Sequence, residues 1–219
     1  KQKILKPAFQ QTGISVAQIP EKEIKTADII FLGPQSPFEI PLEVIKHIYS
    51  SNKNICLYAQ GFFRSFYETE IKEEGWKEAG DYLKLVKILI LSEKHLRALS
   101  KDAELETSLR EVSKMGPSEI IVNLGEKGFL IYSQGAIFSA YFPRLEGTIN
   151  PNGLTSTFSG VYLAERLNKN KVKSAAEYAI QASLLKMSSW SSLKHGRKRI
   201  AGIMAVRKFL ASSEIIPSP

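Results

Sequence analysis

The chain has 219 residues, of which 43% are hydrophobic and 24% charged, with a net charge of +8 that favours anionic partners such as nucleotides. These proportions exclude disordered, collagen-like and low-complexity classes, and no apolar run approaches the roughly 20 residues that span a bilayer, so we expect no membrane partner. The single cysteine, Cys56, excludes an internal disulfide and a multi-cysteine zinc site, which favours a reducing, cytoplasmic location.

Apolar runs that alternate with helical patterns predict an α/β fold on a largely parallel sheet. We expect four adjacent, mostly parallel strands at residues 28–32, 55–58, 88–91 and 119–124. Helices are expected between them at 41–49, 93–98 and 105–115, the first opened by Pro41. After 119–124, a tight turn at Gly125–Gly128 is expected to lead into strands at 129–132 and 136–141. The prediction is a three-layer α/β/α sandwich.

The pattern is helical from Ser156 onward, with helices expected near 158–163, 175–190 and 203–210. The apolar faces of the first two predict four buried residues: Phe158, Val161, Leu184 and Leu185. No repeat or linker divides the chain, so residues 1–219 are predicted to form a single domain.

Small and polar residues at 148–160 lead into the first of these helices. A helix N-terminus reached through such a loop offers free backbone N–H groups and the positive end of the helix dipole, which suit a phosphate group. The alternative is an ordinary helix start in which Thr155 or Ser156 caps the first turn. The residues alone leave both interpretations open.

The segment Asn150–Gly160 resembles the signature of the ribokinase-like (PfkB) carbohydrate kinases, Asp-Thr-Thr-Gly-Ala-Gly-Asp-x-Phe-x-Gly. The matching residues are Gly153, Phe158 and Gly160. Three further segments resemble parts of the same family, in the same order along the chain. Gln60–Arg64 resembles the family's Gln-Gly-Phe-x-Arg run, and 86–93 resembles the strand that ends in its Asn-x-x-Glu motif. The segment 121–128 resembles the strand and turn that lie beside the nucleotide. The resemblance therefore covers nearly the whole chain.

This resemblance implies a ribokinase-like α/β sandwich that transfers phosphate from ATP, with Mg²⁺, to a sugar-type hydroxyl. The nucleotide contacts that it implies are Asn123, Gly125, Gly128, Gly153, Leu154 and Thr155. The sugar-binding strands and lid that open the family's sequence are missing, so the sugar contacts stay unknown. The start at Lys1, without Met, indicates a fragment or a processed product.

The departures from the family pattern lie at the positions implied to react. Within the signature, Ser156 stands at the position of the catalytic base, Asn150 at the first Asp, and Thr155 at the second glycine of the anion hole. In the metal motif, Ser92 and His95 stand at the positions of Asn and Glu. Tyr58 stands at the Asp that precedes the Gln-Gly run. A neutral Ser at the final Asp of the signature and a neutral His at the Glu of the metal motif cannot replace two carboxylates around Mg²⁺, which prefers charged oxygen ligands. We therefore expect weak or absent ATP-dependent phosphoryl transfer, as in a pseudoenzyme.

Two other functions stay open. One is an active sugar or nucleoside kinase whose site is completed by a missing segment or a second subunit. The other is a nucleic-acid-binding module that uses the basic cluster Lys194–Arg199, although a solvated helix start is the more common origin of such a cluster. The missing segment leaves a sheet edge, which predicts either a second copy or a partner chain that covers it, or a marginally stable protein. The three histidines are far apart in sequence and predict no metal site: His47, His95 and His195.

Overall fold

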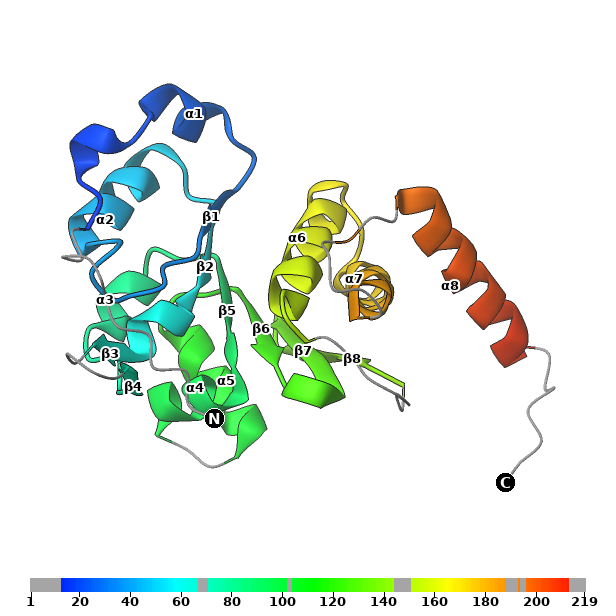
Figure 1. Cartoon of the computed structure of the whole chain (residues 1–219). Helices are drawn as coiled ribbons and strands as arrows, with labels where there is room; N and C mark the ends of the chain where they lie inside the picture. The colour runs from blue at the N-terminus through cyan, green and yellow to red at the C-terminus, as the bar shows by residue number, and fades with distance from the viewer. Residues whose placement is uncertain are drawn as a thin grey trace. The chain divides into compact units, whose positions relative to one another are not determined.

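The computed structural model describes residues 13–66, 71–101, 104–143, 151–187, 193 and 196–212. Four strands pair in parallel, each with the next: β1 (Ile30–Leu32), β2 (Ile55–Tyr58), β5 (Ile88–Ser92) and β6 (Glu119–Asn123). With β7 (Gly128–Ser133) and β8 (Ala136–Tyr141) they make a six-stranded sheet of order β1-β2-β5-β6-β7-β8 (Figure 1). The predicted α/β class and the adjacency of the four parallel strands are confirmed.

The central strands are continuous apolar runs, as expected where both faces of a parallel sheet are covered by helices. In β2, the side chains of Ile55, Cys56 and Leu57 are fully buried. In β5, Leu89, Ile90 and Leu91 are fully buried as well. Burial strongly raises the pKa of the Cys56 thiol, so this cysteine is a core residue with no reactive thiolate.

Five helices accompany the first strands along the chain: α1 (Glu21–Thr26), α2 (Leu42–Ser51), α3 (Ala79–Leu83), α4 (Glu93–Ser100) and α5 (Leu105–Lys114). Pro41 is the N-cap of α2, so the helix begins one residue after the predicted first position. Helices α4 and α5 pack on each other, α4 against β5 and β6 and α5 against β6 (Figure 1). This packing fixes the start of α4 at the end of β5.

The sequence between β2 and β5 contains an antiparallel pair that the sequence analysis did not predict. A 3₁₀ turn, η2 (Ala59–Phe63), leads into β3 (Arg64–Phe66), which pairs with β4 (Ile71–Glu73). An aromatic cluster holds this part together: Phe62 stacks on Trp76 with ring centroids 4.4 Å apart, and both rings contact Tyr82. Two further 3₁₀ turns are η1 (Val16–Gln18) and η3 (Gly125–Lys127).

The chain divides into two compact units, the first comprising Lys1–Leu124 and Tyr132–Ile137 and the second Gly125–Ile131 and Phe138–Pro219. The helices of the second unit are α6 (Leu154–Leu167), α7 (Val172–Met187) and α8 (Arg197–Ser212). Helix α7 packs against both α6 and α8. Phe158 of α6 stacks on Phe129 of β7, with ring centroids 3.8 Å apart. That stack attaches α6 to the strand beneath it.

The burial predicted for α6 and α7 is only partly right. Phe158 is fully buried, whereas Val161, Leu184 and Leu185 are half-buried. The buried face of α7 consists mainly of small residues, which allow the neighbouring helix to approach closely. Its most buried members are Ala175, Ala176, Ala179, Ala182 and Ser183. The prediction gave the larger leucines the central positions, which the alanines occupy.

Within the described residues, β1 lies at one edge of the sheet and no helix is suited to span a membrane. None of the described helices has the length and apolar character needed to cross a membrane. Strand β1 is the first in the sheet order and has no strand on its outer edge within the described part of the chain. A second copy or partner chain on that edge stays a prediction, as do the single domain and the cytoplasmic location.

Candidate functional site

Polar side chains gather where three neighbouring parallel strands end. Tyr58, Ser92 and Asn123 are the last residues of β2, β5 and β6. The carboxyl ends of parallel strands meet at one edge, which is the usual ligand side of an α/β sheet. A cavity of about 190 Å³ lies there, lined by Tyr58, Gln60, Glu73, Ser92, His95 and Asn123. The structure thus brings together Tyr58, Ser92, His95 and Asn123, which the sequence analysis named separately.

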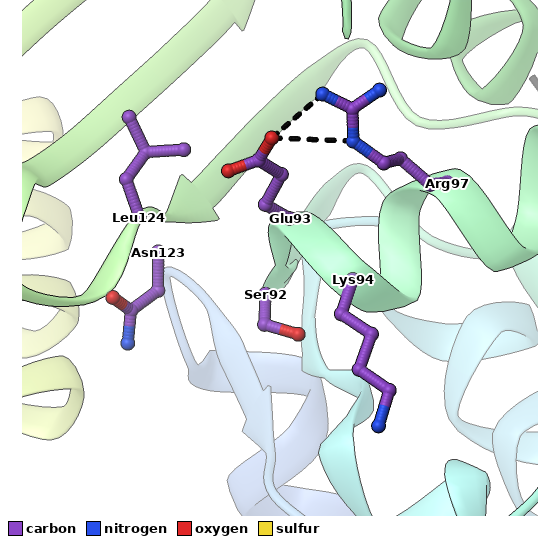
Figure 2. A pocket seen from close by; sticks show the side chains of 6 residues that line it. All are labelled: Ser92, Glu93, Lys94, Arg97, Asn123 and Leu124. Atoms are coloured by element: carbon purple, nitrogen blue, oxygen red, sulfur yellow. Dashed lines mark hydrogen bonds and ion pairs between the residues drawn. The ribbon is translucent and has the colours of Figure 1, made fainter. Parts of the chain in front are cut away.

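A second, more open hollow of about 490 Å³ shares Ser92 and Asn123 with this cavity (Figure 2). Its other lining residues are Glu93, Lys94, Arg97 and Leu124. Within α4, the Arg97 guanidinium donates to the Glu93 carboxylate through Nη2 at 2.7 Å and Nε at 3.2 Å. The two charges of this pair satisfy each other, and the third charged residue of the lining, Lys94, forms an ion pair with Glu73 outside the hollow.

Ser92 has a structural role at the junction of β5 and α4. It is the N-cap of α4, and its Oγ accepts a hydrogen bond from the backbone N–H of His95 at 3.3 Å. Ser and Asn are both strong N-cap residues, so Ser92 satisfies the first turn as an Asn at this position would. The altered residue with chemical consequences is therefore His95.

The imidazole of His95 is buried, with the residue 5% exposed, and it stacks on Phe63 with ring centroids 4.1 Å apart and planes 8° from parallel. Its Nε2 lies 3.8 Å from Glu73 Oε1, too far for a hydrogen bond, and neither ring nitrogen has a partner among the described residues. Burial lowers the pKa of His95, and the nearby Glu73 carboxylate opposes that shift only in part. The ring is neutral near pH 7.

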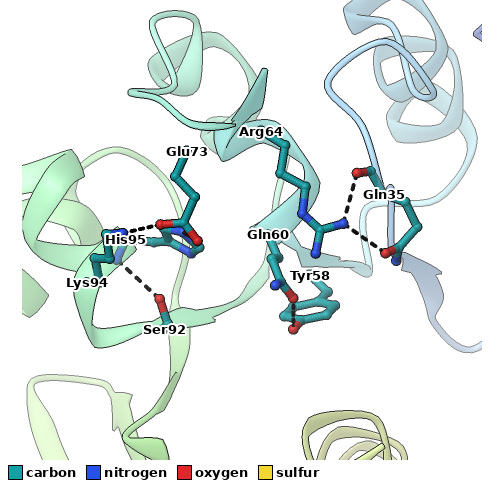
Figure 3. A network of polar contacts seen from close by, with 8 residues as sticks. All are labelled: Gln35, Tyr58, Gln60, Arg64, Glu73, Ser92, Lys94 and His95. Carbon is teal, nitrogen blue, oxygen red and sulfur yellow. Dashed lines mark hydrogen bonds and ion pairs between the residues drawn. The ribbon is translucent and has the colours of Figure 1, made fainter. Parts of the chain in front are cut away.

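Glu73 is the lining residue that the sequence analysis missed. It lies on β4 opposite Arg64, and its carboxylate forms an ion pair with the ammonium group of Lys94 (Figure 3). The hydrogen bond from Lys94 lowers the pKa of Glu73. Because 21 positions separate the two partners, only the tertiary fold brings them together. No local sequence signal indicates this pair.

The Gln60–Arg64 run, which contributes Gln60 to the lining of the cavity, is held in place by close backbone packing and side-chain hydrogen bonds. A Cβ on Gly61 would lie 2.2 Å from the carbonyl oxygen of Pro34, so only glycine fits there. Arg64 Nη1 donates to the backbone and side-chain oxygens of Gln35, each at 3.1 Å (Figure 3). The Tyr58 hydroxyl hydrogen-bonds to Oε1 of Gln60. These contacts fix the Gln60 side chain beside His95.

The other candidate residues lie at the start of α6, which begins at Leu154 and not at Ser156 as expected. The N-cap is Gly153, in the left-handed conformation with φ +75°, so neither Thr155 nor Ser156 is the cap. Glycine adopts this conformation without strain, and the adjacent Leu154 is buried and anchors the first turn. Ser156 is the third helical residue and is exposed. Asn150 lies outside the described residues.

Lys186 of α7 is buried near the start of α6. Its Cε lies 3.6 Å from the point where a Cβ on Gly153 would stand. An ammonium group beside a helix N-terminus adds to the positive potential there and favours an anion. The turn glycines Gly125 and Gly128 both have positive φ, +66° and +119°, which explains why the turn needs glycine. The nucleotide contacts expected from the sequence stay a prediction: Asn123, Gly125, Gly128, Gly153, Leu154 and Thr155.

The basic cluster Lys194–Arg199 begins outside the described residues, which exclude Lys194 and His195. Arg197 is the first residue of α8 and forms an ion pair with the buried carboxylate of Glu165 at 2.9 Å. Asn170 Nδ2 donates to the same carboxylate at 2.6 Å. Arg197 thus attaches α8 within the second unit, a structural role that needs no nucleic acid.

The sequence matches no family model and, at a significant level, no curated protein. The structure is similar to that of a pyrophosphate-dependent kinase in the ribokinase family complexed with a pyrophosphate analog and myo-inositol, with a TM-score of 0.70 and 18% identity over 84% of this chain and 66% of that one. It is also similar to ribokinase from Thermotoga maritima, with a TM-score of 0.66 and 18% identity over 87% of this chain and 61% of that one. The chain has the ribokinase-like fold.

A third similar structure is Arabidopsis thaliana ribokinase complexed with ribose and ATP, with a TM-score of 0.65 and 17% identity over 84% of this chain and 58% of that one. The chain therefore spans less than two thirds of the length of each of these three kinases. These similarities give no support to the nucleic-acid-binding alternative.

The Mg²⁺ ion that the ribokinase-like pattern implies does not fit the residues at 92 and 95. Ser92 caps α4 and His95 is neutral, whereas the one carboxylate that lines the cavity, Glu73, is paired with Lys94. No group of three or more His, Cys, Asp or Glu side chains suited to a metal occurs among the described residues. Mg²⁺ prefers charged oxygen ligands, which the residues at 92 and 95 do not supply.

Proposed function

We propose that the chain is a ribokinase-like phosphotransferase domain with weak or no ATP-dependent transfer to a sugar-type hydroxyl. The ribokinase-like fold supports this reaction class, because the three structurally similar proteins named above are kinases. The observation on which the proposal depends is Ser156, an exposed hydroxyl in the first turn of α6, at the position that the family resemblance assigns to the catalytic base.

The start of α6 is the proposed phosphate site. The N-terminus of α6 supplies backbone N–H groups, and the buried Lys186 near Gly153 adds positive charge. Gly153, Leu154 and Thr155 would contact the phosphates of a weakly bound nucleotide, with Gly125 and Gly128 on the turn before β7. The half-buried Thr155 side chain narrows the approach that a glycine would leave open.

Loss of the base would not by itself abolish the reaction, because phosphoryl transfer depends more on electrostatic stabilisation than on proton removal. A positioned general base contributes roughly 10²–10⁴-fold. Here a serine hydroxyl replaces the carboxylate, and a neutral histidine at 95 accompanies it. These changes compound, so turnover is expected to fall far below the range of about 1–100 s⁻¹ typical of kinases.

The test is ADP release from ATP with a panel of sugars and nucleosides. The protein is compared with Ser156→Asp, which adds the carboxylate, and with Ser156→Asn, a control of similar size without the charge. We expect no turnover near the kinase range in any of the three. Turnover of roughly 1–100 s⁻¹ by the unmodified protein would refute the proposal. A gain of about 10²-fold or more confined to Ser156→Asp would show that residue 156 is the whole defect.

A further inference from the structure

The cavity at the ends of β2, β5 and β6 contains a buried polar group with unmet hydrogen-bonding capacity. Both ring nitrogens of His95 are buried and lack partners among the described residues, and the ring lines the cavity. Its orientation is fixed, because the face stacks on Phe63 and the chain is held by the Ser92 cap. A buried donor or acceptor without a partner is rare and costly in folded proteins, so this one calls for a partner in the cavity.

The charge around the cavity favours an uncharged partner. Glu73 is the only carboxylate in the lining, and Lys94 already neutralises it. An anion would face the Glu73 carboxylate, and a cation would face the Lys94 ammonium. The remaining lining residues are uncharged: Tyr58, Gln60, Ser92, Asn123 and the neutral His95. The Arg64 guanidinium faces Glu73 across the β3–β4 pair, but it lies outside the lining and donates to Gln35. The lining residues together with Lys94 therefore carry no net charge that would favour a metal ion or a phosphate group.

The hydrogen-bonding groups match hydroxyls. A neutral imidazole offers one N–H donor and one acceptor nitrogen. The Ser92 hydroxyl can donate while its oxygen accepts from the His95 backbone, and the Gln60 amide can donate while its oxygen bonds to Tyr58. A ligand hydroxyl both donates and accepts, so it can satisfy such a mixed set. The volume of about 190 Å³ is below the roughly 300–1,000 Å³ of drug-sized sites, which limits the ligand to a few carbons.

We propose that this cavity binds a small uncharged molecule with several hydroxyl groups, and that His95 is its main hydrogen-bonding residue. All lining residues belong to the first unit, so the site needs neither the start of α6 nor a nucleotide. The proposal concerns binding without phosphoryl transfer and goes beyond the proposed function. It also assigns an uncharged ligand to the place where the family resemblance expects a metal motif.

The test uses the full chain labelled with ¹⁵N at its three histidines. Glycerol, ribitol and myo-inositol are titrated in turn, with Mg²⁺ and inorganic phosphate as separate samples. We expect one polyol to shift, saturably, the ring-nitrogen signals that disappear in His95→Phe. The signals of the other two histidines should stay in place. Mg²⁺ and phosphate should leave all three unchanged.

Variants then measure the contribution of His95 by ligand-observed NMR with the same polyol. His95→Phe keeps an aromatic ring for stacking on Phe63 but removes both nitrogens, and we expect affinity to fall at least about tenfold. Gln60→Leu removes one hydrogen-bond donor from the lining of the cavity and should also weaken polyol binding. His47→Phe, on α2 outside the cavity, is the matched control and should bind as the parent does.

The proposal is wrong if no polyol shifts the His95 signals, if phosphate or Mg²⁺ shifts them instead, or if His95→Phe binds the polyol as tightly as the parent. Should His95→Phe fail to fold, Gln60→Leu decides, and unchanged affinity in that variant overturns the proposal. Polyol binding without ADP release supports this inference while leaving the proposed function in place. Kinase-level ADP release with no His95 shift refutes both.

Discussion

Two glycines of one turn, Gly125 and Gly128, provide a sharp test of the packing between β7 and β8. Both have positive φ, and the family resemblance assigns both to the nucleotide. Their surroundings differ, however. A Cβ on Gly128 would lie 2.3 Å from the carbonyl oxygen of Ala140 and 2.9 Å from Cα of Tyr141, whereas a Cβ on Gly125 would meet nothing within 4 Å. The same substitution therefore has two different expected costs.

For Gly125→Ala the only penalty is the left-handed backbone, about 1–2 kcal/mol. Reduced freedom of the unfolded chain returns about 0.4–1 kcal/mol, so the net loss is about 1 kcal/mol. For Gly128→Ala, φ +119° lies outside the left-handed helical region and costs about 1–3 kcal/mol. The contact with backbone atoms of β8 adds about 1–3 kcal/mol, because a strand and not a flexible side chain must move. These two costs sum to about 2–6 kcal/mol, and reduced freedom of the unfolded chain again returns about 0.4–1 kcal/mol, so we expect a net loss of about 3 kcal/mol.

The measurement is urea unfolding of both variants beside the parent, followed by far-ultraviolet circular dichroism. Gly128→Ala should lower the free energy of unfolding by at least about 2 kcal/mol more than Gly125→Ala does. Equal losses would show that β8 does not lie against Gly128, and the reasoning would fail. Gly125→Ala, which keeps the fold, is then the variant in which to measure nucleotide binding at this turn.

Two further predictions concern α6 and His95. Phe158→Ala should lower the free energy of unfolding by about 3–5 kcal/mol, because the ring is fully buried and stacks on Phe129. Val161→Ala should lower it by only about 1 kcal/mol, because Val161 is half-buried. Equal losses for the two variants in urea unfolding would contradict the packing of α6. Burial lowers the pKa of His95 below its ordinary value of 6.5, so the unfolded chain takes up a proton first as the pH falls, and stability drops from about pH 6.5 down to the folded pKa. The melting temperature of the parent should therefore fall more than that of His95→Phe between about pH 7.5 and 5.5, and equal falls would exclude a buried neutral histidine.

Strands with local signals were predicted well, and the elements that depend on tertiary contacts were not. The bounds of β2 and β8 agree with prediction, because an apolar run or a turn marks each end within the sequence itself. The pair β3–β4 consists of two three-residue strands, too short for any periodicity to be visible. The start of α6 was misplaced because Ser and Thr are the usual caps, whereas Gly153 reaches its left-handed conformation as glycine.

The part of the candidate site that lies on predicted strands could be predicted from the sequence, and the part that depends on tertiary contacts could not. Tyr58, Ser92 and Asn123 end predicted strands, so their meeting at one sheet edge follows from parallel pairing. Glu73 could not be found this way, since it reaches the cavity from the unpredicted β4. The neutrality of His95 also depends on burial against Phe63, which no residue pattern shows.

Glu73, Lys94 and His95 must be interpreted as one arrangement. Lys94 neutralises a single carboxylate, and Glu73 already supplies it. A second carboxylate at position 95 would be buried about 4 Å from Glu73, where two like charges repel strongly in a medium of low polarity. A neutral ring that stacks on Phe63 avoids that repulsion and keeps the packing. The neutral histidine therefore avoids the repulsion from Glu73 that a carboxylate at position 95 would meet, and a carboxylate at Ser156 alone leaves this arrangement unchanged.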